Sequence, residues 1–451
     1  MRDKGSVMKG KKYFGIVLIG LLALAGLSQE AKAMPMFTKQ TGMDCMGCHV
    51  QQMPRLNKVG RKFAASGMTL SQHVEELEST EGSFASNMDI NPSFLIKSKY
   101  NRTYDKPDGK GEVSDDITND GEFSAVRMAG IFLGGRVSED FGAILKLGHR
   151  KEEGESIEGK AVYAKAINDE AYLGAVFFST ASFGPFSGME FYNTGLYKPL
   201  RMFDMKIYNN TVQKEKIGAK AATGVQLYYD TDALFNEDDH FFITAGMYAP
   251  AQDNAFIDVS DNLIPFARVV YEYMYSDYNF ILGAFIMSGG DKVAPSEALS
   301  IKRNTYGIDF QIEGYLMEKE VTLAATNVFK NDVEFTGIGA GLEDDAESLY
   351  DEGFSLQGAV SLTDAFIAKV SYMHYNDKNE YREDNLNGTL SPANSIKINT
   401  KDLDYAIGLG LDYGFTLGVP MKLAVEYAWM RPSLNRVENY QNFMVTLTLP
   451  L

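Results

Sequence analysis

The residues Cys45, Cys48 and His49 form the pattern C-x-x-C-H, which is the attachment site of a c-type haem. In such a site the two thiols bond to the haem vinyl groups, and the adjacent histidine ligates the iron from one face. These are the only 2 cysteines among 451 residues, so the spacing does not arise from a pool of thiols. We therefore predict one covalently attached haem c. A disulfide or redox pair between the same two cysteines is the alternative.

An export signal is predicted before this motif. Residues 1–12 are rich in basic side chains, residues 13–27 are apolar, and residues 31–33 (AKA) have the small-x-small pattern of a cleavage site. The apolar run is shorter than the ~20 residues of a membrane-spanning helix. We expect residues 1–33 to be removed after export. The formal net charge of the whole chain is −17, and loss of the basic signal makes it more negative, so nucleic acid is a poor partner.

Beyond about residue 90, apolar and polar residues alternate along the chain. The alternation is clear in residues 305–313, 402–413 and 421–429. This period of two predicts strands with one apolar face and one polar face. The segments exceed the ~5–6 residues of an average strand and suit the ~9–11 residues that a tilted strand needs to cross a bilayer. Between residues 158 and 208 the pattern is blurred.

The connections between these segments are of two kinds. Tight turns are expected at residues 138–140, 276–277, 317–318 and 363–364. Long polar connections are expected at residues 102–121, 288–302, 331–353, 376–401 and 431–440. Short turns at one end and long loops at the other are typical of outer-membrane barrels. We predict an all-β fold, a transmembrane antiparallel β-barrel of about 16 strands with 18 as the alternative, located in the cell outer membrane. A soluble all-β protein with an appended haem is the competing interpretation.

Three parts of the chain are expected: the signal in residues 1–33, a small α-helical cytochrome c segment in residues 34–85, and the barrel in residues 86–451. The first strand is predicted at residues 93–101. A segment as small as 34–85 cannot enclose a macrocycle alone. We expect the barrel wall to complete the enclosure, with the haem segment in the lumen or at its periplasmic mouth.

The haem segment shows two short helical patterns. The first is expected to continue from the motif through His49 and Val50 until Pro54 ends it. The second carries apolar residues at helical spacing between Leu56 and Phe63, and residues 66–67 (SG) provide its stop.

The sixth ligand of the iron is sought among the remaining methionines and histidines. Met53 lies one helical turn from His49 on the same face and cannot reach the other side of the ring. Met68 follows the second helix and can return over the opposite face, and His73 can do so from the tether. We predict Met68, whose thioether would raise the potential relative to histidine. A packed apolar methionine and a solvated histidine are the alternatives.

Two charged features lie near the expected ends of an electron route. Arg61 follows the motif closely and is expected either to pair with a haem propionate or to be exposed. Residues 343–352 (EDDAESLYDE) form an acidic loop whose field would attract cations such as Fe²⁺. A loop that only keeps the surface polar is the alternative interpretation.

Parts of the sequence resemble the fused monohaem cytochrome–porins of the bacterial outer membrane. The resemblance rests on residues 37–49 (FTKQTGMDCMGCH) and 54–63 (PRLNKVGRKF), with further similarity at 184–186 (GPF) and 190–200 (EFYNTGLYKPL). The best-known members are the outer-membrane Fe(II) oxidases of iron-oxidising bacteria. Val59 and Met68 depart from the family, which usually carries aromatic residues at these positions.

The resemblance implies an outer-membrane protein that carries electrons from an extracellular donor, Fe(II), to a periplasmic soluble cytochrome or copper protein. An outlet for electrons to extracellular acceptors and a passive porin with a structural haem segment are the two alternatives. The sequence contains no nucleophile–base constellation that would suggest hydrolysis. The resemblance implies electron transfer as the activity, with Fe(II) oxidation as its leading reaction. The lipid of the outer membrane and an extracellular redox partner are the expected partners.

Overall fold

The computed structural model describes residues 35–43, 45–51, 55–69, 88–106, 121–150, 154–168, 170–189, 196–205, 211–214, 217–218, 221–232, 234–236, 239–249, 263–293, 299–337, 347–377, 380–381, 398–399, 403–416, 420–431 and 438–450. The predicted export signal, Met53, His73 and residues 343–346 of the acidic loop lie outside these ranges. No helix in the described ranges has the length and hydropathy needed to span a membrane.

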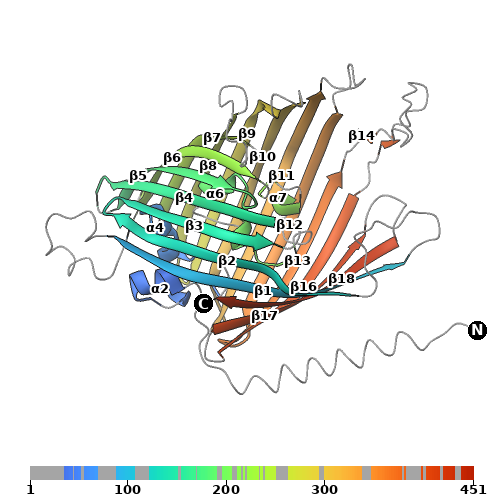
Figure 1. Ribbon diagram of the computed structural model, residues 1–451, viewed down its shortest axis with the longest axis horizontal. Helices are drawn as coiled ribbons and strands as arrows, with labels where there is room; N and C mark the ends of the chain where they lie inside the picture. Colours follow the sequence, from blue (N-terminus) through green and yellow to red (C-terminus); the bar gives the residue numbers. More distant parts are fainter. Residues whose placement is uncertain are drawn as a thin grey trace, which may run out of the picture.

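Sixteen antiparallel strands form a closed barrel, in which β1 pairs with β18 to complete the ring (Figure 1). The strands are β1 (Asp89–Lys106), β2 (Glu122–Ser138), β3 (Phe141–Arg150), β4 (Gly154–Ala166), β5 (Ala171–Thr180), β6 (Ala222–Asp232), β7 (Asp239–Ala249), β8 (Ile264–Tyr275), β9 (Tyr278–Val293), β10 (Leu299–Leu316), β11 (Lys319–Gly337), β12 (Glu347–Ser361), β13 (Phe366–Asp377), β16 (Leu403–Thr416), β17 (Pro420–Arg431) and β18 (Glu438–Pro450). A separate two-stranded pair, β14 (Glu380–Tyr381) and β15 (Ile398–Asn399), lies between β13 and β16 in the chain. The prediction of 16 strands is confirmed.

The apolar and polar residues that alternate along the sequence point to opposite faces of the barrel wall. On β8, the side chains of Arg268 and Glu272 are each 1% exposed and point inward, whereas Val269 between them is 37% exposed. On β10, Asp309 is buried on the inside and Ile308 is exposed on the outside. Apolar residues outside and polar residues inside are the pattern of a barrel that faces lipid. The soluble all-β interpretation is therefore wrong.

The short turns gather at the barrel end where β1 begins and β18 finishes. Ser276, Met317 and Glu318 have positive φ, as the tight two-residue hairpin turns require. The four predicted tight turns are confirmed. The long connections are shorter than predicted, because β9 extends to Val293 and β11 to Gly337. The ends of these strands that adjoin the long connections are polar, and a polar strand end cannot be distinguished from a loop by sequence alone.

The connection from β5 to β6 folds into the barrel instead of leaving it, and we call residues 181–218 the insertion. Its described part contains α6 (Phe186–Met189), η2 (Lys198–Leu200) and α7 (Thr211–Lys214). α6 contacts β5, β6 and β7, whereas α7 contacts β11, β12 and β13, so the insertion crosses the lumen. This explains the blurred sequence pattern after the regular strands β4 and β5.

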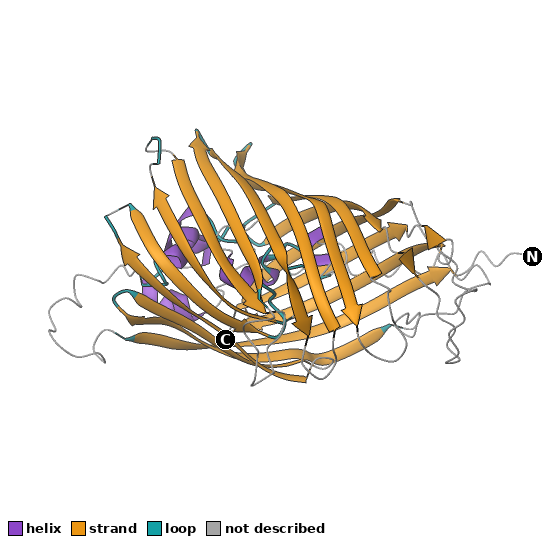
Figure 2. Ribbon diagram, turned by 90° about the horizontal axis from the view of Figure 1, so that it is seen from above, coloured by secondary structure: helices purple, strands orange, loops and turns teal. Residues whose placement is uncertain are grey.

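Short helices lie among the strands (Figure 2). The N-terminal ones are α2 (Pro35–Thr41), α3 (Cys45–Cys48) and α4 (Lys58–Ala65), and Arg61 of α4 binds inward-facing residues of β8 and β10. Phe63 and Met68 belong to the same buried apolar cluster as Phe186 and Leu196 of the insertion. The two inserted segments therefore share one hydrophobic core, and part of the lumen is filled with protein rather than with water.

Candidate functional site

The C-x-x-C-H motif lies on α3 and the residue that follows it. The helix ends at Cys48, and His49 pairs with Leu56 in an isolated β-bridge. The backbone N–H of Asn57 donates to the carbonyl oxygen of Cys48 (2.9 Å), and that of Val50 donates to the carbonyl oxygen of Arg55 (3.0 Å). The prediction that the helix continues through His49 and Val50 is wrong, because these backbone groups pair across a small hairpin.

His49 is oriented by the same hairpin. Its Nδ1 atom lies 3.2 Å from the carbonyl oxygen of Arg55. A carbonyl oxygen can only accept, so Nδ1 carries the proton in this contact and Nε2 presents its lone pair. Histidines that bind metals are oriented in this way by a second hydrogen bond. The arrangement therefore suits His49 as an iron ligand through Nε2.

Asn57 joins the motif to α4. Its Oδ1 accepts the N–H of Gly60 (2.9 Å) as the N-cap of the helix, and its Nδ2 donates to the carbonyl oxygens of Met46 (3.2 Å) and Gly47 (3.1 Å). A Cβ atom at Gly60 would collide with the carbonyl oxygen of Cys48. The amide side chain and the glycine together allow α4 to pack directly against the motif.

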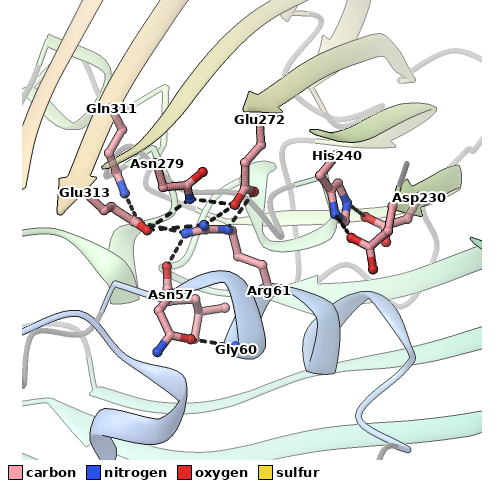
Figure 3. A network of polar contacts seen from close by, with 11 residues as sticks. Asn57, Gly60, Arg61, Asp230, His240, Glu272, Asn279, Gln311 and Glu313 are labelled. Carbon is pink, nitrogen blue, oxygen red and sulfur yellow. Dashed lines mark hydrogen bonds and ion pairs between the residues drawn. The ribbon is translucent and has the colours of Figure 1, made fainter. Parts of the chain in front are cut away.

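Arg61 on α4 is clamped by two carboxylates of the barrel wall (Figure 3). Its guanidinium donates to Glu272 on β8 (2.6 and 3.1 Å) and to Glu313 on β10 (2.7 and 3.2 Å), and all three side chains are buried. Asn279 on β9 donates to Glu272 (2.6 Å), and Gln311 donates to Glu313. The expectation of an exposed side chain is wrong, because the wall supplies buried partners for Arg61, and the propionate pair stays a prediction.

Arg55 reaches a neighbouring part of the wall. Its guanidinium donates to the amide oxygens of Gln357 on β12 (2.8 Å) and Gln311 on β10 (3.4 Å), and the residue is 1% exposed. Its Nε is buried and has no hydrogen-bond partner among the described residues. Burial lowers the pKa of Arg55 to about 10, against the opposing influence of Glu313. Arg55 thus carries a buried charge whose direct partners are neutral amides.

Lys62 on α4 provides a third attachment to the wall. Lys62 donates to Asp232 on β6 (2.6 Å), and His240 on β7 lies between Asp232 (2.7 Å) and Asp230 (2.9 Å). Although partial burial opposes it, the hydrogen bond and charge of Asp232 raise the pKa of Lys62 above its ordinary value. Three basic side chains, those of Arg55, Arg61 and Lys62, therefore fasten residues 55–69 to the acidic and amide groups of the wall.

Met68, the predicted sixth ligand, follows α4 and is 3% exposed in the apolar cluster. Its φ of 62° continues the left-handed turn that Gly67 begins at 75°. The ligand role of Met68 stays a prediction. Cys48 is half-buried, with its Sγ 4.0 Å from Sδ of Met43. Among the described residues, no group of three or more His, Cys, Asp or Glu side chains could hold a separate metal ion.

The residues around the motif fit a covalently bound haem. Oriented by the Arg55 carbonyl, His49 presents Nε2 to a metal, the side chain of Cys48 is half-buried rather than enclosed, and Gly60 allows close packing behind the motif. The side chain of Cys45 is not among those described. Sequence reasoning found this motif but missed its supports, Glu272, Glu313 and Gln357. The one signal for them was their polar character at inward positions of alternating strands, which does not identify a partner.

No protein-family model and no curated protein sequence matches the chain. Similar solved structures include a loop-deletion mutant of the outer membrane protein OmpT of Vibrio cholerae, with 11% identity, a TM-score of 0.47, and coverage of 80% of this chain and 99% of that one. An anion-selective porin from Comamonas acidovorans has 10% identity, a TM-score of 0.47 and the same coverage. The outer membrane channel DcaP of Acinetobacter baumannii has 13% identity and a TM-score of 0.46, over 80% of this chain and 97% of that one. Because these TM-scores are below 0.5, the assignment of a closed 16-stranded barrel rests on the strand pairings of this chain and not on the similarity.

Proposed function

We propose that this protein is an outer-membrane cytochrome–porin that carries electrons between an extracellular donor, with Fe(II) as the leading candidate, and a soluble cytochrome or copper protein in the periplasm. The observation that supports the proposal is that α4, which packs against the C-x-x-C-H motif, is fastened to the wall of a 16-stranded barrel by the buried Arg61 clamp. A band of membrane ~25 Å tall separates the two partners, and a redox group within the barrel would shorten that gap.

Haem c, held by Cys45, Cys48 and His49, would supply one-electron redox chemistry at this position. The chain's own residues hold and orient it. Asn57 and Gly60 pack α4 against the motif, and the Arg55 carbonyl fixes the tautomer of His49. Phe63 on α4 belongs to a buried apolar cluster, which would limit the access of water to this side of the helix. Electron transfer needs no proton-abstracting side chain, so the lack of a catalytic constellation in the sequence agrees with this function.

A passive porin is the second candidate, and the closed 16-stranded barrel with a polar inner wall favours it. The insertion and the haem segment weigh against it, because both occupy the lumen and share one core. Conductance separates the two candidates. An open porin passes ions through wild-type barrels in a planar bilayer, whereas we expect low conductance from this protein.

Covalent haem is the first test of the proposal. Mature protein, made in cells that attach c-type haem, is denatured, separated by electrophoresis and stained for haem peroxidase activity. We expect a stained band for the wild type and none for a Cys45→Ala, Cys48→Ala variant. A Met46→Ala variant, changed inside the same motif, serves as the matched control and should retain the stain. Equal staining of the double variant would overturn the assignment.

A further inference from the structure

Four buried charges lie beside the haem motif, and we call Arg55, Arg61, Glu272 and Glu313 the charge cluster. Their exposed fractions are 1%, 1%, 1% and 7%. The two carboxylates both bind Arg61, whereas Arg55 reaches Glu313 only through the amide of Gln311. Formal charges in the cluster cancel, with two positive and two negative groups.

The cluster is connected to His49 by both arginines. The carbonyl oxygen of Arg55 contacts Nδ1 of His49 (3.2 Å). Arg61 donates to the carbonyl oxygen of Leu56 (2.6 Å), and Leu56 is the residue that pairs with His49 in the β-bridge. The residues that orient His49 and its bridge partner thus carry buried charges or bind them, and buried charges act through a medium of low dielectric constant, where their interactions are little screened.

We propose that the charge cluster sets the midpoint potential of the haem attached at Cys45, Cys48 and His49, with Arg55 and Glu313 acting in opposite directions. This inference rests on the proposed function, since it concerns the haem of that site. Oxidised haem iron carries one more positive charge than reduced iron. A buried cation therefore favours the reduced form and raises the potential, and a buried carboxylate lowers it. Burial and local charge are recognised means by which a protein adjusts haem potentials.

The test is a spectroscopic redox titration of the purified haem-loaded protein. Arg55→Gln leaves a net negative cluster and should lower the midpoint potential. Glu313→Gln leaves a net positive cluster and should raise it. The double variant restores the balance and should return the potential toward the wild-type value. Lys165→Gln removes a cation that is 57% exposed and paired with Asp140 at the rim, and should leave the potential unchanged.

The opposite signs separate an electrostatic role from a structural one. Loosening of the haem segment would shift the potential in the same direction in both single variants, and the double variant would be the most altered. Shifts of equal sign, or no shifts, overturn the inference. If Arg55→Gln does not fold, the rise expected for Glu313→Gln decides the question. Absence of covalent haem from the wild type would instead overturn the proposed function.

Discussion

Arg61 and Lys62 are neighbours on α4 and both pair with carboxylates of the wall, but they differ in burial. The side chain of Arg61 is 1% exposed, and that of Lys62 is 34% exposed. Removing one partner of a buried ion pair costs about 3–5 kcal/mol, whereas an exposed pair contributes about 0.2–1 kcal/mol. Arg61→Met should therefore release the haem segment from the wall, and Lys62→Met should have a small effect.

Hydrogen exchange of residues 55–69 in the folded protein measures this difference. We expect protection in this segment to fall strongly in Arg61→Met and to stay near the wild-type level in Lys62→Met, with the strands protected in both. Equal protection in the two variants would show that the clamp does not hold the segment.

Met68→Leu tests the predicted sixth ligand. Leucine keeps most of the apolar volume in the cluster around Met68 and removes the thioether. If Met68 ligates the iron, the variant loses the thioether-to-iron charge-transfer band and its midpoint potential falls. An unchanged spectrum would assign Met68 to packing alone and direct the search to His73.

At the scale of residues, the sequence predicts what depends on local spacing. Cys45, Cys48 and His49 are adjacent in the chain, so their chemistry could be inferred directly. The partners of Arg61 could not, because Glu272 and Glu313 lie 211 and 252 residues further along the chain. From the sequence alone, we expect this guanidinium to pair with a haem propionate or to be exposed, whereas in the structure two distant carboxylates bind it.

Among the elements, the insertion is fastened at both sides of the barrel. Ser182 donates to the carboxylate of Glu158 on β4. On the far wall, the carboxylate of Glu426 on β17 accepts the backbone N–H groups of Asp204 and Met205, each at 2.9 Å, and Lys369 on β13 donates to it. A buried carboxylate that accepts several hydrogen bonds strongly stabilises the segment that supplies them.

Glu426→Gln replaces one acceptor oxygen by an NH₂ group, which cannot accept a backbone N–H. The far part of the insertion should detach, and ion conductance in planar bilayers should rise above that of the wild type. Lys165→Gln is the control, because this side chain is 57% exposed and binds Asp140 rather than a residue of the insertion. Conductance unchanged by Glu426→Gln would mean that the insertion does not restrict the pore.

The sequence predicted strands better than the segments that fill the barrel. Period two is imposed by lipid on one face, so it persists through strands such as β8 and β10. The insertion has no such constraint, and its apolar residues Phe186 and Leu196 serve an interior that only the closed barrel creates. Likewise, the short hairpin at His49 depends on backbone pairing with Leu56, which helical spacing does not reveal.

At the scale of the whole molecule, the closed barrel and the filled lumen have different consequences. The barrel resembles a pore in its strand number and its polar inner wall. However, the haem segment and the insertion share one hydrophobic core, so both segments pack together and the barrel is not an empty pore. We therefore predict that electrons pass across the membrane while large solutes do not.

Liposomes that contain the haem-loaded protein and trapped oxidised cytochrome c provide the most direct measurement. Fe²⁺ is added outside, and reduction of the trapped protein is followed by its absorbance. We predict reduction with the wild type and none with His49→Ala, which should insert equally well. Reduction at the same rate with His49→Ala, or none with a haem-loaded wild type, would contradict electron transfer by this protein.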